Sequence, residues 1–299
     1  MSRLLAEPTR HVVDTRAPLL TLFTVLKPFV GEADVHQRNA IASWRALSPD
    51  VEVILISDSS IPADIRAECN CYRATKMNRY GTPLLDGVFR LAAEQGRGSM
   101  RAFVNADIIL DGRFVRAAEQ LLESGLKSWL AIGQRTELDV PEIVDHTTDE
   151  WIAECFRRLD CDGTHASIVC KDYFIFPADL FRDVPAFAIG RGNWDSWMVW
   201  QSKASQIPVV DISEVAPVIH QKHGYNHVSG GRFSAYVSGP EARENQRLAG
   251  GRNLLSGSTA DWKMDANGIH RLPFATFRIG KDVFRFASLL RSMVRLPVS

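Results

Sequence analysis

Short apolar runs alternate with amphipathic segments along the first half of the chain, and this alternation constrains the fold more than any other feature. The runs that predict buried strands lie at 19–26, 51–56, 100–104 and 129–132. The segments with apolar residues at helical spacing lie between them, at 34–47, 83–95 and 114–122. Strands that alternate with helices form a mostly parallel sheet with helices on its faces. We therefore expect an α/β fold.

The second half of the chain is less regular. Its strand-like and helical segments lie at 173–176, 194–203 and 208–212. Residues 220–270 have the Gly, His, Asn and Ser content that is typical of loops. Because no linker separates the two halves, we expect a single domain at 18–270 after an N-terminal extension at 1–17.

The charge of the chain is balanced in total but uneven along its length. There are 35 Lys and Arg residues and 35 Asp and Glu residues, which argues against a nucleic-acid binder that works through bulk charge. From Arg271 onward, six basic residues and one acidic residue give a net charge of +5. The first 270 residues therefore hold 29 basic and 34 acidic residues, a net of −5. The sequence predicts a mildly acidic globule with a basic tail at 271–299.

The basic tail has an amphipathic pattern. Placed on a helix at 100° per residue, residues 278–296 divide into an apolar side and a side of Arg and Lys. Such a helix fits the surface of an anionic membrane. It equally fits a terminal helix that packs its apolar side on the domain.

Cysteine content and hydropathy bear on the compartment. Five cysteines, an odd number in a chain of 299 residues, do not indicate a disulfide framework. The first 18 residues contain no apolar run long enough for a signal peptide, and no run of about 18 apolar residues predicts a membrane span. We expect a cytoplasmic protein with reduced thiols.

Polar side chains follow the ends of three predicted strands. Lys27 follows the first, Asp58 the second, and Asn105 and Asp107 a later one. Ligands of open α/β sheets bind beyond the carboxyl ends of the strands, and a carboxylate there can hold a divalent cation that neutralises phosphate. An Asx-turn is the alternative reading of Asn105-Ala106-Asp107. The glycine patterns of dinucleotide-binding and P-loop proteins are absent.

Two stretches of the second half carry further candidates. In 187–200, three tryptophans flank Asp195 where a helix should start, and aromatic faces suit stacking on a sugar ring. The alternative is a helix-capping Asp with tryptophans in the core.

In 220–227, the pattern His-x-x-His-x-x-x-His is compatible with a zinc site. The alternative is a polar surface loop with histidines.

Together these features resemble a known family. The segments that carry the resemblance are Lys27-Pro28-Phe29, residues 37–44, Asp58, Gly81-Thr82-Pro83-Leu84-Leu85-Asp86 and Val104-Asn105-Ala106-Asp107-Ile108. Over roughly 18–228 the chain resembles nucleotide-diphospho-sugar transferases of the GT-A fold. In that family an Asp-x-Asp motif binds the ribose of the donor and a Mn²⁺ or Mg²⁺ ion. This chain has Asn105 at the first position of the motif and Asp107 at the second.

The resemblance implies roles for individual residues. The implied donor site comprises Lys27, Asp58, Arg79, Asp86, Asn105 and Asp107. In it, Asp58 would lie near the base, and Lys27 and Arg79 would offset diphosphate charge. His220 or His223 would complete the metal site with Asp107. Asp195 would act as the catalytic base of an inverting reaction, or position the acceptor in a retaining one. The residues implied at the acceptor or diphosphate are Arg191, Trp194 and Trp197.

The resemblance thus implies a metal-dependent glycosyltransferase of polysaccharide biosynthesis. It would move a sugar from a nucleotide-diphosphate sugar, with UDP as the expected nucleotide, to a saccharide or lipid-linked saccharide. The nucleotide-binding part would span about 18–135, and the acceptor and metal part about 136–270. A lipid-linked acceptor favours a peripheral position of 278–296 on the inner face of the membrane. The alternatives are a non-catalytic sugar-nucleotide-binding protein, which Asn105 favours, and a zinc hydrolase that uses the histidines.

Overall fold

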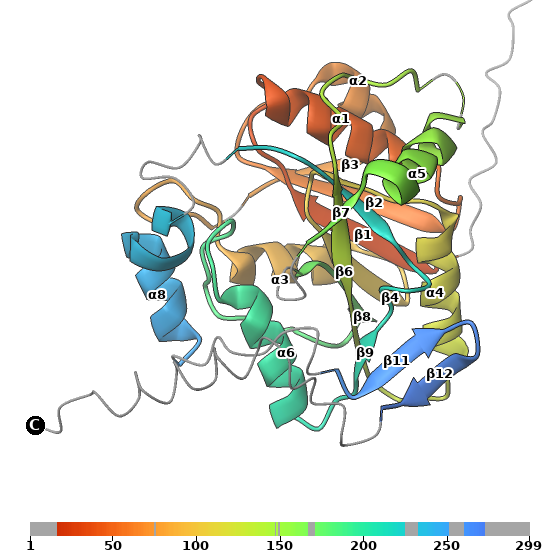
Figure 1. The fold of residues 1–299 in the computed structure, drawn as a ribbon. Coiled ribbons are helices and arrows are strands. Elements are labelled where there is room, and N and C mark those ends of the chain that lie inside the picture. The colour runs from red at the N-terminus through yellow and green to blue at the C-terminus, as the bar shows by residue number, and fades with distance from the viewer. Residues whose placement is uncertain are drawn as a thin grey trace, which may run out of the picture.

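A central sheet with helices on both faces forms the body of the protein (Figure 1). The computed structural model describes residues 17–74, 76–146, 148, 150–166, 171–224, 233–250 and 260–272. The predicted tail helix at 278–296 and the N-terminal extension up to residue 16 lie outside these residues. Within the described chain, no helix has the length and apolar character needed to cross a membrane.

The strands of the main sheet follow the order β12-β11-β9-β6-β8-β4-β1-β2-β3. Their bounds are β1 Leu20–Val25, β2 Val51–Ser57, β3 Asn70–Arg73, β4 Met100–Val104, β6 Leu130–Leu138, β8 Lys171–Pro177, β9 Val209–Asp211, β11 Trp262–Asp265 and β12 Gly268–Arg271. Strands β3, β2, β1 and β4 are parallel neighbours, and so are β6, β9 and β11. Strand β8 is antiparallel to both β4 and β6, so the two groups run in one direction. The predicted α/β class with a mostly parallel sheet is confirmed.

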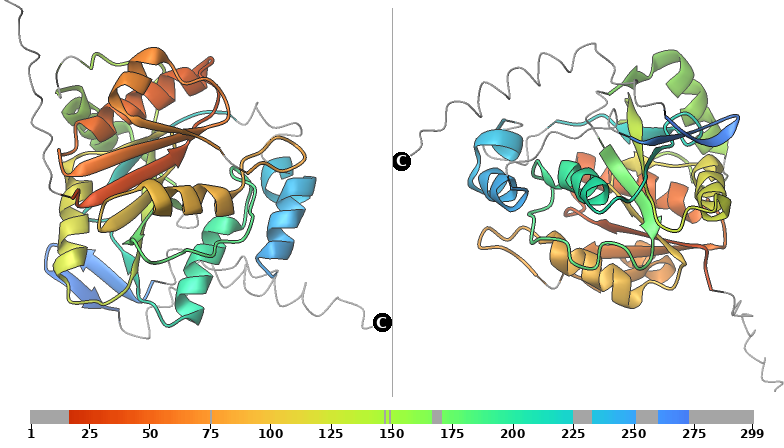
Figure 2. Two further views of the ribbon diagram at one scale, coloured as in Figure 1. Left: turned by 180° about the vertical axis from the view of Figure 1, so that it is seen from behind. Right: turned by 90° about the horizontal axis from the view of Figure 1, so that it is seen from below.

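Two hydrophobic cores lie on the two faces of this sheet. The helices are α1 Glu32–Arg45, α2 Ala63–Glu68, α3 Leu85–Gln95, α4 Gly112–Glu123, α5 Glu150–Asp162, α6 Trp194–Ala204, η1 Ser234–Ser238 and α8 Pro240–Leu248. Helices α1, α2 and α4 contribute to one core, and α3 and α6 to the other (Figure 2). The fully buried Trp44 of α1 and Phe103 of β4 lie in these respective cores. The periodic segments of the sequence therefore fold as their patterns predict.

A short strand, β10 (Val218–Gln221), pairs with two other strands beside the main sheet. It runs parallel to the far half of β6 and antiparallel to β5 (Ile108–Ile109). In this register His220 pairs with Ile108, the residue after Asp107. A second short strand, β7 (Thr164–His165), pairs with β6 next to it. Strand β10 thus brings His220, from the second half of the chain, beside Asp107 in the turn that follows β4.

Asp34 and Gln37 have the spacing of a capping box, but α1 begins before them. The helix begins at Glu32, after Gly31 in the left-handed region at φ 56°. Gln37 is buried. Its Oε1 accepts a hydrogen bond from Lys27 N at 2.6 Å, and its Nε2 donates to Lys27 O. Gln37 thus holds the end of β1 and does not cap the helix. Asn193, at the N-cap position of α6, makes no side-chain cap bond and has φ 84°.

A buried carboxylate at the opposite, amino-terminal end of the strands offers a test of the fold. Glu52 accepts hydrogen bonds from Thr21 Oγ1 at 2.9 Å and from the backbone and Nε of Arg97 at 2.8 Å. Burial alone would raise the pKa of Glu52, but the bonds from Arg97 and Thr21 outweigh it and hold the pKa below its usual range. Glu52 therefore stabilises the fold above the unfolded-state pKa of about 4.3, and this stability is lost as the pH falls through the lower folded-state pKa.

We predict that Glu52→Gln lowers the free energy of unfolding by about 1–3 kcal/mol at pH 7. Chemical denaturation of both proteins from pH 7 down to about pH 3 should show the difference shrinking, because the wild-type carboxylate becomes protonated. An equal difference across this range would contradict the ionised, hydrogen-bonded role of Glu52.

Candidate functional site

The candidate site is built around Asp107, in the turn that joins β4 to β5. The turn closes through a hydrogen bond from Ile108 N to Asn105 O at 3.2 Å. The backbone oxygen of Asp107 accepts from Gln221 N and Gln221 Nε2, both at 3.2 Å. The turn is therefore fixed to β10, and the Asp107 side chain, 14% exposed, stays at the carboxyl end of the sheet.

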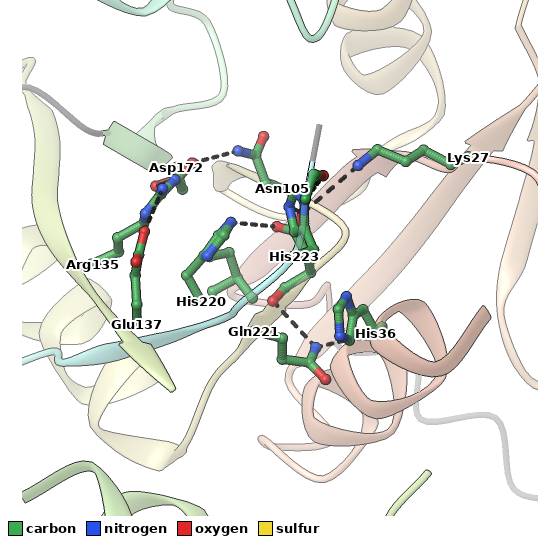
Figure 3. Close-up of polar contacts among 12 residues, drawn as sticks. Lys27, His36, Asn105, Arg135, Glu137, Asp172, His220, Gln221 and His223 are labelled. Atoms are coloured by element: carbon green, nitrogen blue, oxygen red, sulfur yellow. Dashed lines mark hydrogen bonds and ion pairs between the residues drawn. The ribbon is translucent and has the colours of Figure 1, made fainter. Parts of the chain in front are cut away.

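Three basic side chains from distant parts of the chain face the Asp107 carboxylate. His223 Nε2 lies 3.1 Å from Oδ2, and His220 Nε2 lies 3.8 Å from Oδ1. Lys27 Nζ lies 4.0 Å from Oδ2 (Figure 3). The structure thus brings Lys27, Asp107, His220 and His223 together.

Electrostatics keep this carboxylate ionised. Burial alone would raise the pKa of Asp107, but His220, His223 and Lys27 together outweigh it and hold the pKa far below its usual range. The hydrogen bond to Asp107 raises the pKa of His223. Burial is the largest cause that lowers the pKa of His220. A carboxylate and a neutral imidazole are the forms of these side chains that bind metal ions.

The buried polar atoms of the site fit a divalent cation. One possible ligand atom each from Asp107, His220 and His223 lie within 4.8 Å of one another. Asp107 Oδ1 and His220 Nδ1 are buried, and no hydrogen-bond partner for either exists in the part of the chain that the structure describes. Buried polar atoms are rarely left unsatisfied, and such an exception needs an explanation such as a bound ion. We call Asp107, His220 and His223 the cation triad.

A third histidine, His36 of α1, lies beside the cation triad. Its side chain is buried, and its ring centroid is 6.0 Å from that of His223. Burial lowers the pKa of His36. Sequence reasoning missed this residue. The available signal was a histidine on the apolar-faced helix that follows Lys27.

Buried amides hold the site together. Gln221 Nε2 donates to the backbone oxygen of His36 at 2.8 Å (Figure 3), and Gln221 Oε1 accepts from Asn39 Nδ2 at 3.0 Å. Asn39 also donates to the backbone oxygen of Glu142 at 3.0 Å. These bonds tie α1, the helix that flanks Lys27, to β10, the strand that carries His220.

A second polar network lies at the first position of the motif. Asn105 Nδ2 donates to Asp172 Oδ1 at 2.7 Å, and Arg135 Nη1 donates to Asp172 Oδ2 at 2.7 Å. Arg135 Nη2 reaches Glu137 at 2.9 Å. These side chains come from β4, β8 and β6, which are neighbours in the sheet. Sequence reasoning did not identify Asp172, Arg135 or Glu137.

The other residues expected at the donor site each have contacts of their own. Asp58 is exposed at the end of β2, Arg79 stacks over the Tyr80 ring at 4.9 Å, and Asp86 pairs with Lys76 at the start of α3. Among the described residues, no hydrogen bond or ion pair that the structure shows joins these three side chains to the cation triad. Their roles at the donor stay predictions.

Asp195 and Arg191 both have charged partners. Asp195, in the first turn of α6 and 25% exposed, lies 3.6 Å from the buried Lys171 Nζ. Arg191 is held by Glu241 of α8, with Arg191 Nη2 2.6 Å from Glu241 Oε2. Glu241 in turn accepts from Asn78 at 2.6 Å. Glu241 therefore joins α8 both to Arg191 and to the loop before α3, and the expected contact of Arg191 with a ligand stays a prediction.

The two tryptophans expected at the acceptor lie in the core. Trp194 contacts the rings of Phe103 and Phe174 at centroid distances of 5.2 and 5.4 Å, and Trp197 contacts Phe187 at 5.5 Å. Both indoles are more than nine-tenths buried. This burial corrects the expectation that they stack on a sugar, because their helix positions direct both of them onto the sheet.

Comparison with known proteins gives similar folds but no sequence match. No family model and no curated protein sequence matches the chain. A fragment of TarS from S. aureus, residues 1–349, matches with a TM-score of 0.45 and 12% identity, over 93% of this chain and 75% of the fragment. TarS has also been solved in complex with UDP-GlcNAc. A putative nucleotide-diphospho-sugar transferase from Desulfovibrio desulfuricans G20 matches with 0.44 and 12%, over 79% and 98%. A mycobacterial protein matches with 0.47 and 15%, over 86% and 84%.

The donor set of the cation triad predicts a metal preference. Two imidazoles favour transition metals such as Mn²⁺ over Mg²⁺, which prefers oxygen ligands. We predict that His220→Gln weakens Mn²⁺ binding by at least about tenfold, measured by isothermal titration calorimetry. His270→Gln, which changes a histidine far along the chain on β12, is the control and should bind Mn²⁺ like the wild type. Equal affinity of the wild type for Mg²⁺ and Mn²⁺ would contradict the assignment.

Proposed function

We propose that the protein is a metal-dependent glycosyltransferase that uses a nucleotide-diphosphate sugar as donor. The cation triad beside Lys27, at the carboxyl end of β4 and β1, is the observation that carries this proposal. That edge of an open α/β sheet is where ligands bind. A diphosphate needs positive charge around its oxygens, and this edge offers a partly exposed ammonium and ligands for a divalent cation.

The cation, when bound by the triad, would neutralise charge on the diphosphate leaving group. Lys27 supplies a second positive charge. Its side chain is 43% exposed, so the ammonium can reach a ligand, while Gln37 fixes its backbone. The removal of charge repulsion and the fixed position of these groups are what a transfer reaction requires of the protein.

Asp195 is our candidate for the group that activates the acceptor. A carboxylate that reaches the acceptor hydroxyl can take its proton as the new glycosidic bond forms, if the reaction inverts the anomeric centre. In a retaining reaction Asp195 would position the acceptor instead. The buried Lys171 holds this carboxylate in place at the start of α6.

The finer details of the proposal concern the donor and acceptor. We place the base near Asp58, which would accept a ring N–H of uracil, with Arg79, Asp86 and Arg191 as further donor contacts. The acceptor is a saccharide or a lipid-linked saccharide. A lipid-linked acceptor accords with the basic amphipathic pattern of 278–296.

Binding of the donor can be measured directly. We predict that UDP-sugars with Mn²⁺ raise the thermal midpoint by about 5–10 °C at a hundredfold excess over Kd, and raise it far less without the metal. Lys27→Met should weaken UDP binding by about tenfold or more without weakening the binding of Mn²⁺, because the substitution removes a positive charge beside Asp107. No response to any nucleotide sugar in the presence of Mn²⁺ would contradict the proposal.

Turnover distinguishes an enzyme from a sugar-nucleotide-binding protein of the same fold. We predict that Asp195→Asn lowers transfer or hydrolysis of the donor by about 10²–10⁴-fold. Donor affinity, measured by calorimetry, should stay at the wild-type value. Donor binding without any turnover in the wild type, unaffected by this substitution, would instead indicate the non-catalytic alternative.

A further inference from the structure

The amide of Asn105 has only one orientation that its surroundings accept. Its Nδ2 donates to Asp172 Oδ1 at 2.7 Å, and its backbone N–H donates to the backbone oxygen of Asp172 at 2.9 Å. An ionised carboxylate accepts hydrogen bonds and cannot donate one. The Nδ2 of Asn105 must therefore face Asp172. Figure 3 shows the carbonyl oxygen of Asn105 turned away from that carboxylate.

Asp172 itself is fixed in place. Its side chain is 8% exposed, and its second oxygen accepts from Arg135 Nη1 at 2.7 Å. Arg135, also only 10% exposed, is anchored by Glu137 at 2.9 Å. A carboxylate held by a buried guanidinium cannot turn aside to make room for another group. The side chain at position 105 therefore faces the fixed negative charge of Asp172.

This arrangement explains why position 105 is Asn. A carboxylate at this position would stand at hydrogen-bond distance from Asp172, where like charges repel. Asn offers the same shape with a donor toward Asp172 and an acceptor on the other side. Asn105 thus leaves the first position of the motif without a negative charge, because Asp172 on the neighbouring strand β8 already carries one.

We propose that Asp172 is a positioning residue that presents the Asn105 carbonyl oxygen as a hydrogen-bond acceptor for a ribose hydroxyl of the donor nucleotide. The inference rests on the proposed function, because it assumes a nucleoside diphosphate at the cation triad. Asp172 makes no contact with the ligand itself. It acts through Asn105, two residues before Asp107 in the same turn.

Exchange of the two residues provides the test. In the double variant that combines Asn105→Asp with Asp172→Asn, the amide at position 172 can donate to the carboxylate at position 105 and still accept from Arg135. Every hydrogen bond of the network then has a counterpart. The probes are UDP and 2′,3′-dideoxy-UDP, each with Mn²⁺, in calorimetric titrations of the full-length protein. Thermal midpoints of all variants are recorded. Glu52→Gln, a carboxylate-to-amide change at the opposite end of the strands, is the control for a general loss of stability.

We expect each single substitution to weaken UDP binding by about tenfold, and the exchange to restore most of it. The ratio of the Kd for 2′,3′-dideoxy-UDP to the Kd for UDP reports the contact with the ribose hydroxyl. A purely structural role of Asp172 would leave this ratio unchanged. This ratio should be large in the wild type and in Glu52→Gln, and close to one in Asp172→Asn. Failure of Asn105→Asp to fold, with the exchanged protein folded, also supports the repulsion, and the Asp172→Asn ratio then decides the ribose contact.

Other outcomes separate the two claims. If the wild type binds UDP, either of two results would overturn the role of Asp172 and leave the proposed function intact. In one, Asp172→Asn leaves the ratio of Kd values unchanged. In the other, Asn105→Asp binds UDP as tightly as the wild type. No binding of UDP by the wild type in the presence of Mn²⁺ would overturn the proposed UDP-dependent function, and the inference with it.

Discussion

The ionised carboxylate of Asp107, nearly withdrawn from solvent, is the constraint on which the site depends. A buried charge is costly unless it is paired and hydrogen-bonded. Here His223, His220 and Lys27 surround it, and their combined effect outweighs the desolvation that would otherwise neutralise Asp107. None of the three is close to Asp107 in the sequence. The fold must therefore bring β1, β4 and β10 to one point before the charge can be stable there.

Buried amides achieve this convergence. Gln37 fixes the backbone of Lys27, and Gln221 joins β10 both to α1 and to the Asp107 turn. The Asn105–Asp172–Arg135 network fixes the other side of the same turn. Hydrogen-bonded side chains in a low-dielectric interior restrict one another's positions. The site is thus preorganised by its surroundings, which is what electrostatic stabilisation of a leaving group requires.

Local patterns in the sequence predicted most of the scaffold, and the family resemblance implied that Asp107 lies near a histidine. The buried strands and amphipathic helices of the first half appear with small shifts at their ends, except that the strand predicted at 129–132 continues to Leu138. Asp107, His220 and His223 lie in one cluster. What local patterns could not supply was long-range pairing. Asp172 meets Asn105 across 67 residues, and Gln221 meets Asn39 across 182. The pairing of β10 with β5 and β6 likewise has no local signal.

Two kinds of residue have roles that their residue type and local spacing do not indicate. Trp194 and Trp197 have the composition of a sugar-binding surface, but their helix spacing directs them into the core, where phenylalanines cover them. Gln37 has the spacing of a capping box, yet its burial makes it a clamp on Lys27. In both cases the tertiary position decided the role, and residue type alone did not.

Pulsed electron paramagnetic resonance of Mn²⁺ bound to the protein in the presence of UDP tests the central claim most directly. We predict ¹⁴N couplings from two imidazoles, of which one is lost in His220→Gln, together with ³¹P couplings from the diphosphate on the same ion. Mn²⁺ that shows ³¹P couplings but no ¹⁴N couplings, or no ³¹P couplings at all, would contradict a diphosphate-binding cation site at Asp107, His220 and His223.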